Sequence, residues 1–353
     1  MEDMSKWERV KAALKGKPVD RVPISCFMHN YAAENGSPDV LAAHLIKQNS
    51  NYGWDFIKIQ LGYTWYAEAW GCKYNWDSSW CVDIGPQPIL DTLPVKRGDD
   101  LGRLKKPDSK SGVITNQVKV ASILSKNLKG ELPVIQTTFS PLMIVNMLQG
   151  WVGESAIQTA MAQKYMRETP ELMHHALSVI SQTMADYARE SVRAGADGIF
   201  MTTSPWTQDW MTDDEYLTFG KPYELPIYKA ALEEGATLNV LHICKDNIFF
   251  DALLDYPVQL IQFENTSPRN PSLCEAMART EKALWAGVSH RSDSPLVIGP
   301  IEAIAAQVHS ALDETGGRRF VLGAVCTFSP STPEAHIRAL KEAIYTWQAS
   351  HGK

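Results

Sequence analysis

Several features that define common protein classes are missing from this chain of 353 residues. No apolar run approaches the roughly 18 residues of a membrane-spanning helix, so no such helix is predicted. The formal net charge is −6 and no basic stretch opposes it, which disfavours a nucleic-acid partner. The N-terminal segment MEDMSKWERVKAALKGKPVD is charged and amphipathic, without the apolar stretch of a signal peptide.

Cysteine is also scarce, with six residues in the chain. So few cysteines in a chain of this length do not form a disulfide framework, and reduced thiols in the cytoplasm are the simpler expectation. The hydrophobic content of 44% is enough for a large core, in one α/β domain or two smaller ones. Because no linker-like stretch divides the chain, residues 1–353 are expected to form a single domain.

What the sequence does contain is an alternation of short runs rich in Val, Ile and Phe with longer segments of helical period. Such a pattern predicts βαβ units and a parallel sheet. Eight runs over most of the chain predict a (β/α)8 TIM barrel behind an N-terminal helix. The runs are Arg21–His29, Asp55–Gly62, Leu132–Phe139, Asp197–Ser204, Leu238–Cys244, Val258–Asn265, Lys282–Ser289 and Phe320–Thr327. The clearest helices are predicted over Pro170–Ala194, Asp213–Glu234, Ile301–Glu314 and Pro333–Ser350.

Residues 63–112 depart from this alternation and are predicted to be an insertion after the second strand. The segment carries four tryptophans, namely Trp65, Trp70, Trp76 and Trp80, followed by a polar, Lys-rich stretch. The insertion is expected over the mouth of the barrel, although it could instead cover the outside. The tryptophans could line a site for a flat aromatic substrate, or simply pack the insertion onto the barrel.

A set of metal-ligating residue types falls where predicted strands end. His242 and Cys244 are two residues apart, so they share one face of a strand. Glu264 ends the sixth strand and Cys326 the eighth, and strand ends of a TIM barrel meet at its active face. Two thiolates, an imidazole and a carboxylate are suitable ligands for Zn²⁺. With zinc they sum to a formal charge of about −1, which suits binding a substrate thiol as thiolate.

Less specific explanations exist for each of these residues. An H-x-C tripeptide arises readily by chance, and Cys326 has the apolar neighbours of a buried structural cysteine. Glu264 could only cap the turn that follows its strand. If it is a ligand, its hard oxygen makes it the one most easily displaced by substrate.

Four stretches resemble the uroporphyrinogen decarboxylase superfamily, and together they run over nearly the whole chain. They are the opening KWERVKAALKGKPVDRVPIS, AGADGIF in the fourth predicted strand, LHICKDN in the fifth, and the closing FVLGAVCTFSPSTPEAHIRALKEAI. True uroporphyrinogen decarboxylases carry Arg-Gln-Ala-Gly-Arg just after the first strand. The corresponding residues Phe27–Glu34 contain no arginine, so binding of a substrate with many carboxylates is disfavoured.

The resemblance is instead to the corrinoid-linked branch, which includes methylcobalamin:coenzyme M methyltransferases. Zinc ligands of that branch match His242, Cys244 and Cys326, and the related cobalamin-independent methionine synthases add a carboxylate that matches Glu264. The resemblance implies zinc-assisted methyl transfer. Because the chain has no room for a cobalamin domain, it also implies a corrinoid carried by a separate protein. The small-molecule partner could be a methoxyaromatic or other methylated donor, or a thiol acceptor.

Further polar residues at strand ends are candidates for catalysis or substrate binding. His29, at the end of the first strand, is a candidate acid–base group alongside Glu264. Arg291 could bind an anionic group or pair with Asp293 at the rim. The candidates for substrate contact are Lys58, Gln60, Thr203, Trp206, Gln262 and Arg291.

Two other functions remain open at this point: decarboxylation on a metal-free barrel, and non-catalytic zinc binding. A homodimer is also possible, since barrels of this size often pair.

Overall fold

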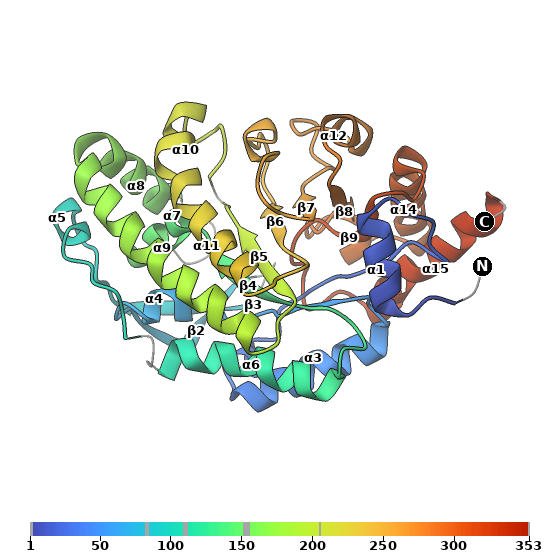
Figure 1. The fold of residues 1–353 in the computed structure, drawn as a ribbon, viewed down its shortest axis with the longest axis horizontal. Coiled ribbons are helices and arrows are strands. Elements are labelled where there is room, and N and C mark those ends of the chain that lie inside the picture. Colours follow the sequence, from blue (N-terminus) through green and yellow to red (C-terminus); the bar gives the residue numbers. More distant parts are fainter. Residues whose placement is uncertain (1–2, 82–84, 109–111, 151–155, 205, 352–353) are drawn as a thin grey trace.

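The structure is a computed structural model that describes residues 3–81, 85–108, 112–150, 156–204 and 206–351 (Figure 1). Its centre is one curled sheet of seven parallel strands in the order β1-β4-β5-β6-β7-β8-β9. Each strand lies inside a predicted run and is buried on both faces, as a parallel sheet covered by helices requires. The strands are β1 (Ile57–Lys58), β4 (Val134–Phe139), β5 (Gly198–Thr202), β6 (Val240–Ile243), β7 (Leu260–Phe263), β8 (Ala283–Val288) and β9 (Phe320–Ala324).

The first predicted run, Arg21–His29, is not a regular strand. It makes only two isolated parallel bridges, Ile24 with Leu322 and Met28 with Phe328. On its other side, the backbone N–H of Asp55 donates to the carbonyl of Ile24 at 2.7 Å. The segment therefore contacts both edges of the sheet, at β9 and at the residues just before β1. Pro23 explains the irregularity, because it has no N–H to contribute to a ladder.

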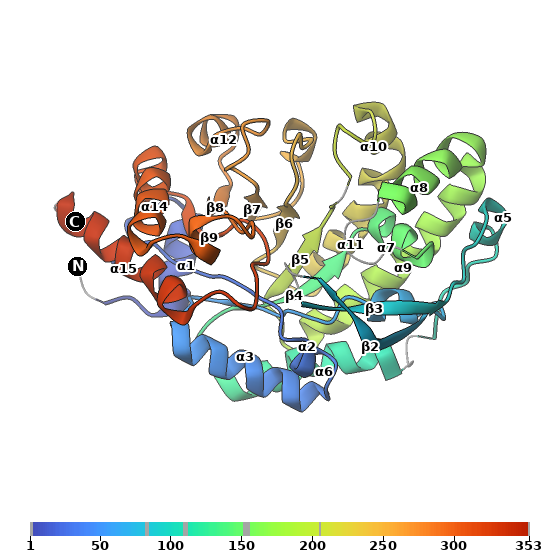
Figure 2. The same cartoon turned by 180° about the vertical axis from the view of Figure 1, so that it is seen from behind.

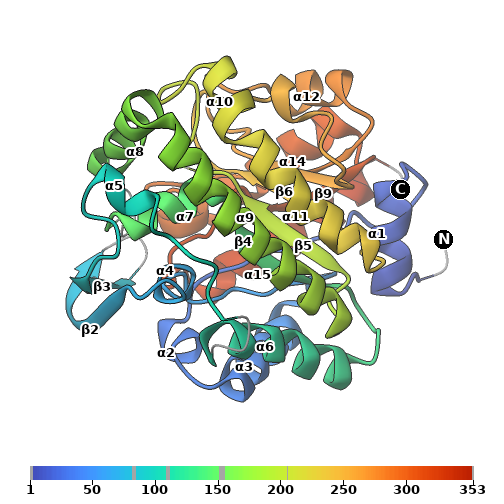
Figure 3. The same ribbon diagram turned by 60° about the vertical axis from the view of Figure 1, so that its left-hand side comes forward.

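Helices cover the outer face of the sheet (Figures 1 and 3). The predicted helix Asp213–Glu234 is divided at Gly220, because Pro222 has no N–H to donate to the carbonyl four residues earlier and so cannot continue the first helix. The helices are α1 (Lys6–Leu14), α2 (Tyr31–Glu34), α3 (Pro38–Tyr52), α4 (Trp65–Glu68), α5 (Gly98–Leu101), α6 (Gly112–Leu128), α7 (Pro141–Leu148), α8 (Ala156–Glu168), α9 (Pro170–Arg193), α10 (Asp213–Phe219), α11 (Lys221–Glu233), α12 (Leu273–Arg279), α13 (Pro295–Ile298), α14 (Ile301–Thr315), α15 (Glu334–Ser350) and the short 3₁₀ helix η1 (Asp251–Leu253). None of those described is long and apolar enough to span a membrane.

The predicted insertion contains an antiparallel hairpin, β2 (Lys73–Cys81) with β3 (Gly85–Thr92), flanked by α4 and α5. The hairpin lies at the edge of the molecule beside α4 and α5 (Figures 2 and 3). Trp65 is buried against Tyr66 and Tyr187, with ring centroids 3.9 and 4.9 Å apart. This tryptophan therefore packs α4 onto α9. The side chains of Trp76 and Trp80 lie outside the part of the structure that is described.

Two hydrophobic clusters form the core. The larger one fills the space between sheet and helices, and the smaller one lies inside the curl of the sheet. In the inner cluster, Trp285 lies 4.8 Å from Phe56 and 5.6 Å from Phe27, and its indole N–H donates to the Ser25 carbonyl. These large side chains close the interior below the strand ends and form the floor of the site described next.

Candidate metal centre

His242, Cys244 and Cys326 converge at the carboxyl ends of β6 and β9. Their ligand atoms all lie within 4.8 Å of one another. The period of the strand explains the first two, because residues two apart on β6 point to the same side. Cys326 reaches them from two residues beyond the end of β9. The structure thus brings together three of the four residues expected as metal ligands.

The spacing of these atoms fits a tetrahedral zinc site. Nε2 of His242 lies 3.6 Å from Sγ of Cys326. Around tetrahedral zinc, bonds of about 2.3 Å to sulfur and about 2.05 Å to nitrogen place the two ligand atoms about 3.6 Å apart. Among the residues that the structure describes, no other group of three or more His, Cys, Asp or Glu has such convergent donors. The donor set and its spacing therefore fit Zn²⁺.

The two thiols share one negative charge in the absence of a cation. A hydrogen bond from Cys244, aided by the nearby His242, holds the pKa of Cys326 well below its usual value despite burial. The same contact with the Cys326 thiolate, together with burial, raises the pKa of Cys244 well above the usual value. Ser204 also hydrogen-bonds Cys244, and it favours the thiolate form. A dication in this position would replace the proton that Cys244 keeps.

The imidazole of His242 is positioned by aromatic packing. Phe200 stacks on it with ring centroids 4.9 Å apart, and the edge of Phe27 lies 6.3 Å away. Its Nε2 faces Cys326, whereas Nδ1 is buried and accepts or donates no hydrogen bond among the described residues. Packing, and not a polar partner on Nδ1, therefore fixes the orientation of this ring.

Glu264 lies beside the three-residue cluster and faces a histidine. Its Oε2 is 3.2 Å from Nδ1 of His290, and its Oε1 accepts from the backbone and the hydroxyl of Thr266. Burial raises the pKa of Glu264, but its contacts with His290 and Thr266 outweigh burial and lower it. Burial likewise lowers the pKa of His290, but Glu264 and Cys326 outweigh it and raise the pKa. Both shifts favour the charged forms, and the imidazole of His290 faces Oε2 of Glu264.

A second polar group lies on the same floor of the barrel. The ammonium of Lys58 donates to Oε1 of Gln60 and lies over the rings of Phe27, at 4.2 Å, and Phe200, at 4.8 Å. Burial lowers the pKa of Lys58 to about 7, against the raising effect of Cys326 and other nearby groups. Phe200 thus separates this cation from His242. Lys58 carries its charge close to the metal cluster without contacting a carboxylate.

Gln60 connects Lys58 to His29. Its amide nitrogen lies 3.1 Å from Nδ1 of His29, and the same Nδ1 lies 2.9 Å from Glu34. Tyr31 stacks on the imidazole with centroids 4.7 Å apart. The structure therefore joins three of the expected site residues in one chain that ends on Glu34.

The remaining expected residues are placed differently. Gln262 is buried and donates to the Ala324 carbonyl at 2.9 Å, while its Oε1 has no partner among the described residues. Thr203 is buried, and its backbone N–H donates to the His242 carbonyl at 3.1 Å. Trp206 is buried in the outer core cluster. Arg291 is half exposed and pairs with Asp246 at 2.9 Å; Asp293 was one of the two alternatives considered for it.

Sequence reasoning missed three residues at the site: Ser204, His290 and Glu34. Ser204 is the last residue of a predicted strand and His290 directly follows another, and a position at a strand end was the signal that identified Cys244 and Glu264. Arg291 was preferred over His290 as a candidate because of its charge. Glu34 gave no such signal, because it lies in a short helix and reaches His29 by a turn.

Comparison with known proteins gives these features a family context. The family model described as Uroporphyrinogen decarboxylase (URO-D) matches residues 5–347. The methylcobamide:CoM methyltransferase MtbA of Methanosarcina mazei is 23% identical, over 99% of this chain and 100% of that protein. A uroporphyrinogen decarboxylase of Synechococcus sp. is 24% identical, over only 54% of this chain and 52% of that protein.

A solved structure described as a methyltransferase from Methanosarcina mazei superposes with a TM-score of 0.78. The match covers 98% of this chain and 99% of that chain, at 21% sequence identity. At this level of identity the superposition shows a shared fold. The expected resemblance to this superfamily is confirmed, and the relatives matched end to end bear the methyltransferase name.

Proposed function

The chain belongs to the uroporphyrinogen decarboxylase family, and on that premise we propose that it is a zinc-dependent methyltransferase. In this proposal it moves a methyl group between a small molecule and the corrinoid of a separate protein. The observation that carries it is the convergence of His242, Cys244 and Cys326 within 4.8 Å. Support also comes from the M. mazei relative, named a methylcobamide:CoM methyltransferase, which the chain matches over its full length.

His242, Cys244 and Cys326 would hold the zinc, and Glu264 would be the exchangeable fourth ligand. When bound, zinc supplies a Lewis acid that holds a substrate thiol as thiolate or polarises a methoxy oxygen. Methyl transfer is an in-line displacement, in which the nucleophile's electron pair forms the new bond to carbon as the leaving atom keeps the old pair. The chain's part is to orient the two reactants and exclude water. His290 supports this role for Glu264, because it holds the carboxylate ionised beside the cluster.

The chain Lys58–Gln60–His29 would bind the small molecule opposite the cluster. Lys58 donates one described hydrogen bond, to Gln60, so its ammonium has donors left for an anionic or polar substrate group. His29, paired with Glu34, is the proposed acid–base group. The free Oε1 of Gln262 supports it as a further contact. Thr203, Trp206 and Arg291 are kept as proposed contacts that would orient the substrate from the surrounding loops.

The donor or acceptor is proposed to be a methoxyaromatic compound, another methylated donor, or a thiol. The buried aromatic floor of Phe27 and Phe200 supports an aromatic substrate. The Cys-rich donor set supports a thiol, since it makes zinc electron-rich and a poor generator of hydroxide. With either substrate, the same three residues would hold the zinc. A methoxyaromatic would donate its methyl group to the corrinoid, and a thiol would accept one from it.

We also propose that the curled sheet is a closed (β/α)8 barrel, with the segment around Ile24 as its eighth member. The bridges to Leu322 and the hydrogen bond from Asp55 support this closure. Residues 1–353 are proposed to form one domain with residues 63–112 as its insertion. Cytoplasmic location and a homodimer are part of the same proposal. The five cysteines that the structure describes are free, as reduced thiols would be.

Decarboxylation of a uroporphyrinogen-type substrate is the alternative. It would need several basic side chains at the site, whereas Lys58 and Lys245 are the lysines near the cluster among the described residues, and Arg291 is already paired. A non-catalytic zinc-binding barrel would instead need a site with no exchangeable position. Glu264, held beside the cluster by His290, favours a site with an exchangeable ligand.

The proposal is tested by metal analysis together with methyl transfer. Purified protein is expected to hold one zinc per chain and to exchange methyl groups between methylcobalamin and one member of a panel of thiols and methoxyaromatics. Cys326→Ser is expected to lose the zinc and at least about a hundredfold in activity, since one of the three permanent protein ligands is removed. Cys274→Ser, which changes an exposed cysteine of α12, is the matched control and should keep both.

Full zinc content and activity in Cys326→Ser would refute the role of the cluster. Turnover of uroporphyrinogen by metal-free protein would establish the decarboxylase instead. X-ray absorption with and without the active substrate would then distinguish an enzyme from a binding protein, because only the enzyme mechanism requires a zinc ligand to be replaced.

A further inference from the structure

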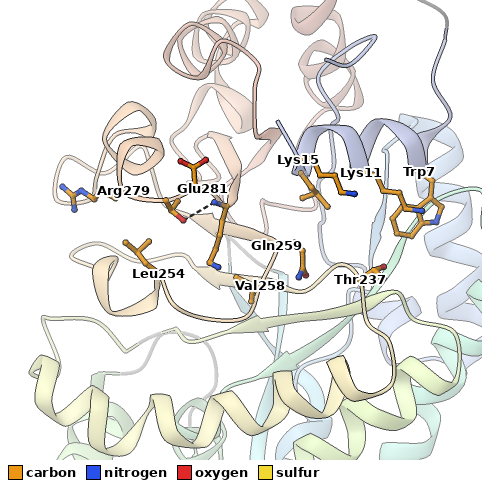
Figure 4. A pocket seen from close by; sticks show the side chains of 12 residues that line it. Trp7, Lys11, Lys15, Thr237, Leu254, Val258, Gln259, Arg279 and Glu281 are labelled. Carbon is orange, nitrogen blue, oxygen red and sulfur yellow. Dashed lines mark hydrogen bonds between the residues drawn. The ribbon is translucent and has the colours of Figure 1, made fainter. Parts of the chain in front are cut away.

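A cavity of about 660 Å³ lies at the opposite end of the sheet from the metal cluster (Figure 4). One side is formed by α1, with Trp7, Lys11 and Lys15, and the facing side carries Val258 and Gln259. The rest comes from the turns before β6, β7 and β8. Its volume lies in the range that accepts an organic molecule of moderate size.

This cavity is separate from the proposed catalytic site. Thr237 lines it before β6 begins, and His242 belongs to the metal cluster at the end of the same strand. Five residues of extended chain span about 16 Å. A ligand in the cavity therefore could not contact His242, Cys244 or Cys326.

The lining carries positive charge that the protein does not neutralise. Lys11, Lys15 and Lys282 all line the cavity, and none forms an ion pair in the part of the chain that is described. Three nearby carboxylates are engaged elsewhere: Glu281 with Arg319 at 3.3 Å, Asp255 with Lys221 at 2.7 Å, and Asp251 with Arg279 at 3.5 Å. Asp255 also acts on Lys282 and Asp197 on Lys11, but neither forms an ion pair with these lysines. Burial lowers the pKa of Lys282 and outweighs the raising effect of Asp255, so a further anionic group would stabilise its charge there.

The uncharged part of the lining is largely apolar. Leu14 and Leu254 are half-buried, Val258 is buried, and Trp7 contributes an indole. The ammonium of Lys11 lies 4.3 Å from the centre of the Trp7 ring, so charge and aromatic surface are adjacent. Three unpaired cations beside an apolar wall are complementary to a molecule with an anionic group on an apolar body. The chain as a whole has a net charge of −6, so this group of cations is a local feature. The three lysines come from segments that are distant in the sequence.

We propose that this cavity binds a small amphipathic organic anion, such as an aromatic carboxylate, sulfonate or phosphate. The apolar body lies against Trp7, Leu254 and Val258, and the anionic group is held by Lys11, Lys15 and Lys282. The site belongs to the N-terminal end of the sheet and acts independently of the methyl-transfer site.

Anilinonaphthalene sulfonate is a suitable probe, because its fluorescence rises when it binds an apolar site. Zinc-loaded full-length protein is titrated with it, in parallel with N-phenylnaphthylamine, which has the same ring skeleton without the sulfonate. Saturable binding of the sulfonate at one site is expected. The neutral compound is expected to bind about tenfold more weakly, as loss of several half-exposed charge contacts implies.

The variant Lys11→Gln with Lys282→Gln is expected to weaken sulfonate binding by about tenfold. Lys229→Gln, which changes an exposed lysine of α11, should leave binding unchanged. Thermal unfolding of both variants checks that the fold is kept, which is expected because Lys11 and Lys229 are exposed and Lys282 is only partly buried. Equal binding of the sulfonate by the double variant and the wild type would overturn the proposal. So would equal affinity for the neutral compound, or an absence of saturable binding.

Discussion

Two cysteine thiols and one imidazole cannot supply two thiolates without a counter-charge. Each thiol shifts the pKa of the other: that of Cys326 lies well below its usual value, and that of Cys244 well above it. The buried ammonium of Lys58 lies on the far side of Phe200 and carries the nearby positive charge. At the scale of residues, the site can therefore hold one dication between the two thiols and an anionic or polar substrate group beside Lys58.

Replacing Lys58 by Met removes this ammonium and keeps most of its apolar volume. Because hydrogen bonds to a charged group contribute about 1.5–3 kcal/mol, KM for an anionic or phenolic substrate is expected to rise by about tenfold to a hundredfold. Zinc content should stay at one per chain. Steady-state kinetics and metal analysis on the same preparation measure both quantities.

The pH dependence of the wild type gives a second readout of Lys58. Its pKa of about 7 means that the side chain is protonated below pH 7 and loses its charge above it. KM for an anionic substrate is therefore expected to rise with pH above about 7 in the wild type, and to be flat in Lys58→Met. Lys229→Met, at an exposed position, serves as the control. If Lys58→Met loses zinc but keeps the KM of the wild type, then Lys58 supports the metal site and does not bind substrate.

The convergence of His242, Cys244 and Cys326 could be predicted, because strand period and chemistry agree there. His242 and Cys244 share a face of β6 by their spacing, and Cys326 follows from the end of β9. The partners of charged residues were not predictable in the same way. Glu264 contacts His290, and Arg291 contacts Asp246 instead of the adjacent Asp293, because loops between elements decide which charges meet.

At the scale of elements, the seven regular strands were predicted because buried parallel strands are continuous apolar runs bounded by turns. The break between α10 and α11 was missed, although Gly220 and Pro222 mark it. A buried carboxylate lies at this junction. Glu224 accepts hydrogen bonds from Tyr216 at 2.7 Å and from Tyr256, so the two tyrosines join α10, α11 and the turn after η1. The helix break is thus where a polar cluster replaces apolar packing.

Replacing Glu224 by Gln is expected to stabilise the protein at high pH. Burial raises the pKa of Glu224 to about 7, against its usual 4.5. The folded state therefore binds the proton more tightly than the unfolded state. Stability contributed by this group is complete below pH 4.5 and is lost as the pH rises through 7, a loss of about 3 kcal/mol. The amide of the variant would keep an acceptor for both tyrosines and would have no charge to acquire.

Urea unfolding of wild type and variant at pH 5 and pH 8 tests this. The two proteins should have similar stability at pH 5, and Glu224→Gln should be more stable at pH 8. Glu302→Gln, at an exposed position of α14, controls for the general change in net charge. A stability difference that is the same at both pH values would mean that Glu224 does not carry its proton in the folded state at pH 5.

At the scale of the whole molecule, the N-terminal segment joins the two edges of the sheet. The run Arg21–His29 was predicted as a strand and makes only bridges, so its position depends on side chains. Asp55, just before β1, is fully buried and accepts from Arg9 on α1 and from Arg21. It also accepts from the backbone N–H of Ile24 at 2.8 Å. Such a cluster of distant residues gives no periodic signal in the sequence, which is why it was not foreseen.

Asp55→Asn tests whether this cluster holds the segment around Ile24 against the two edges of the sheet. The amide removes the negative charge from between Arg9 and Arg21 and turns a donor toward one of them. Removing one partner of a buried ion pair leaves uncompensated charge, so stability is expected to fall by about 3–5 kcal/mol. The urea midpoint should drop accordingly, whereas Asp99→Asn, at an exposed position of α5, should leave it unchanged. Because Asp55 lies at the end of the sheet opposite the metal cluster, zinc content in folded protein should stay at one per chain. A fall of less than about 1 kcal/mol would mean that backbone bridges and apolar packing around Ile24 hold the segment without the ion pairs.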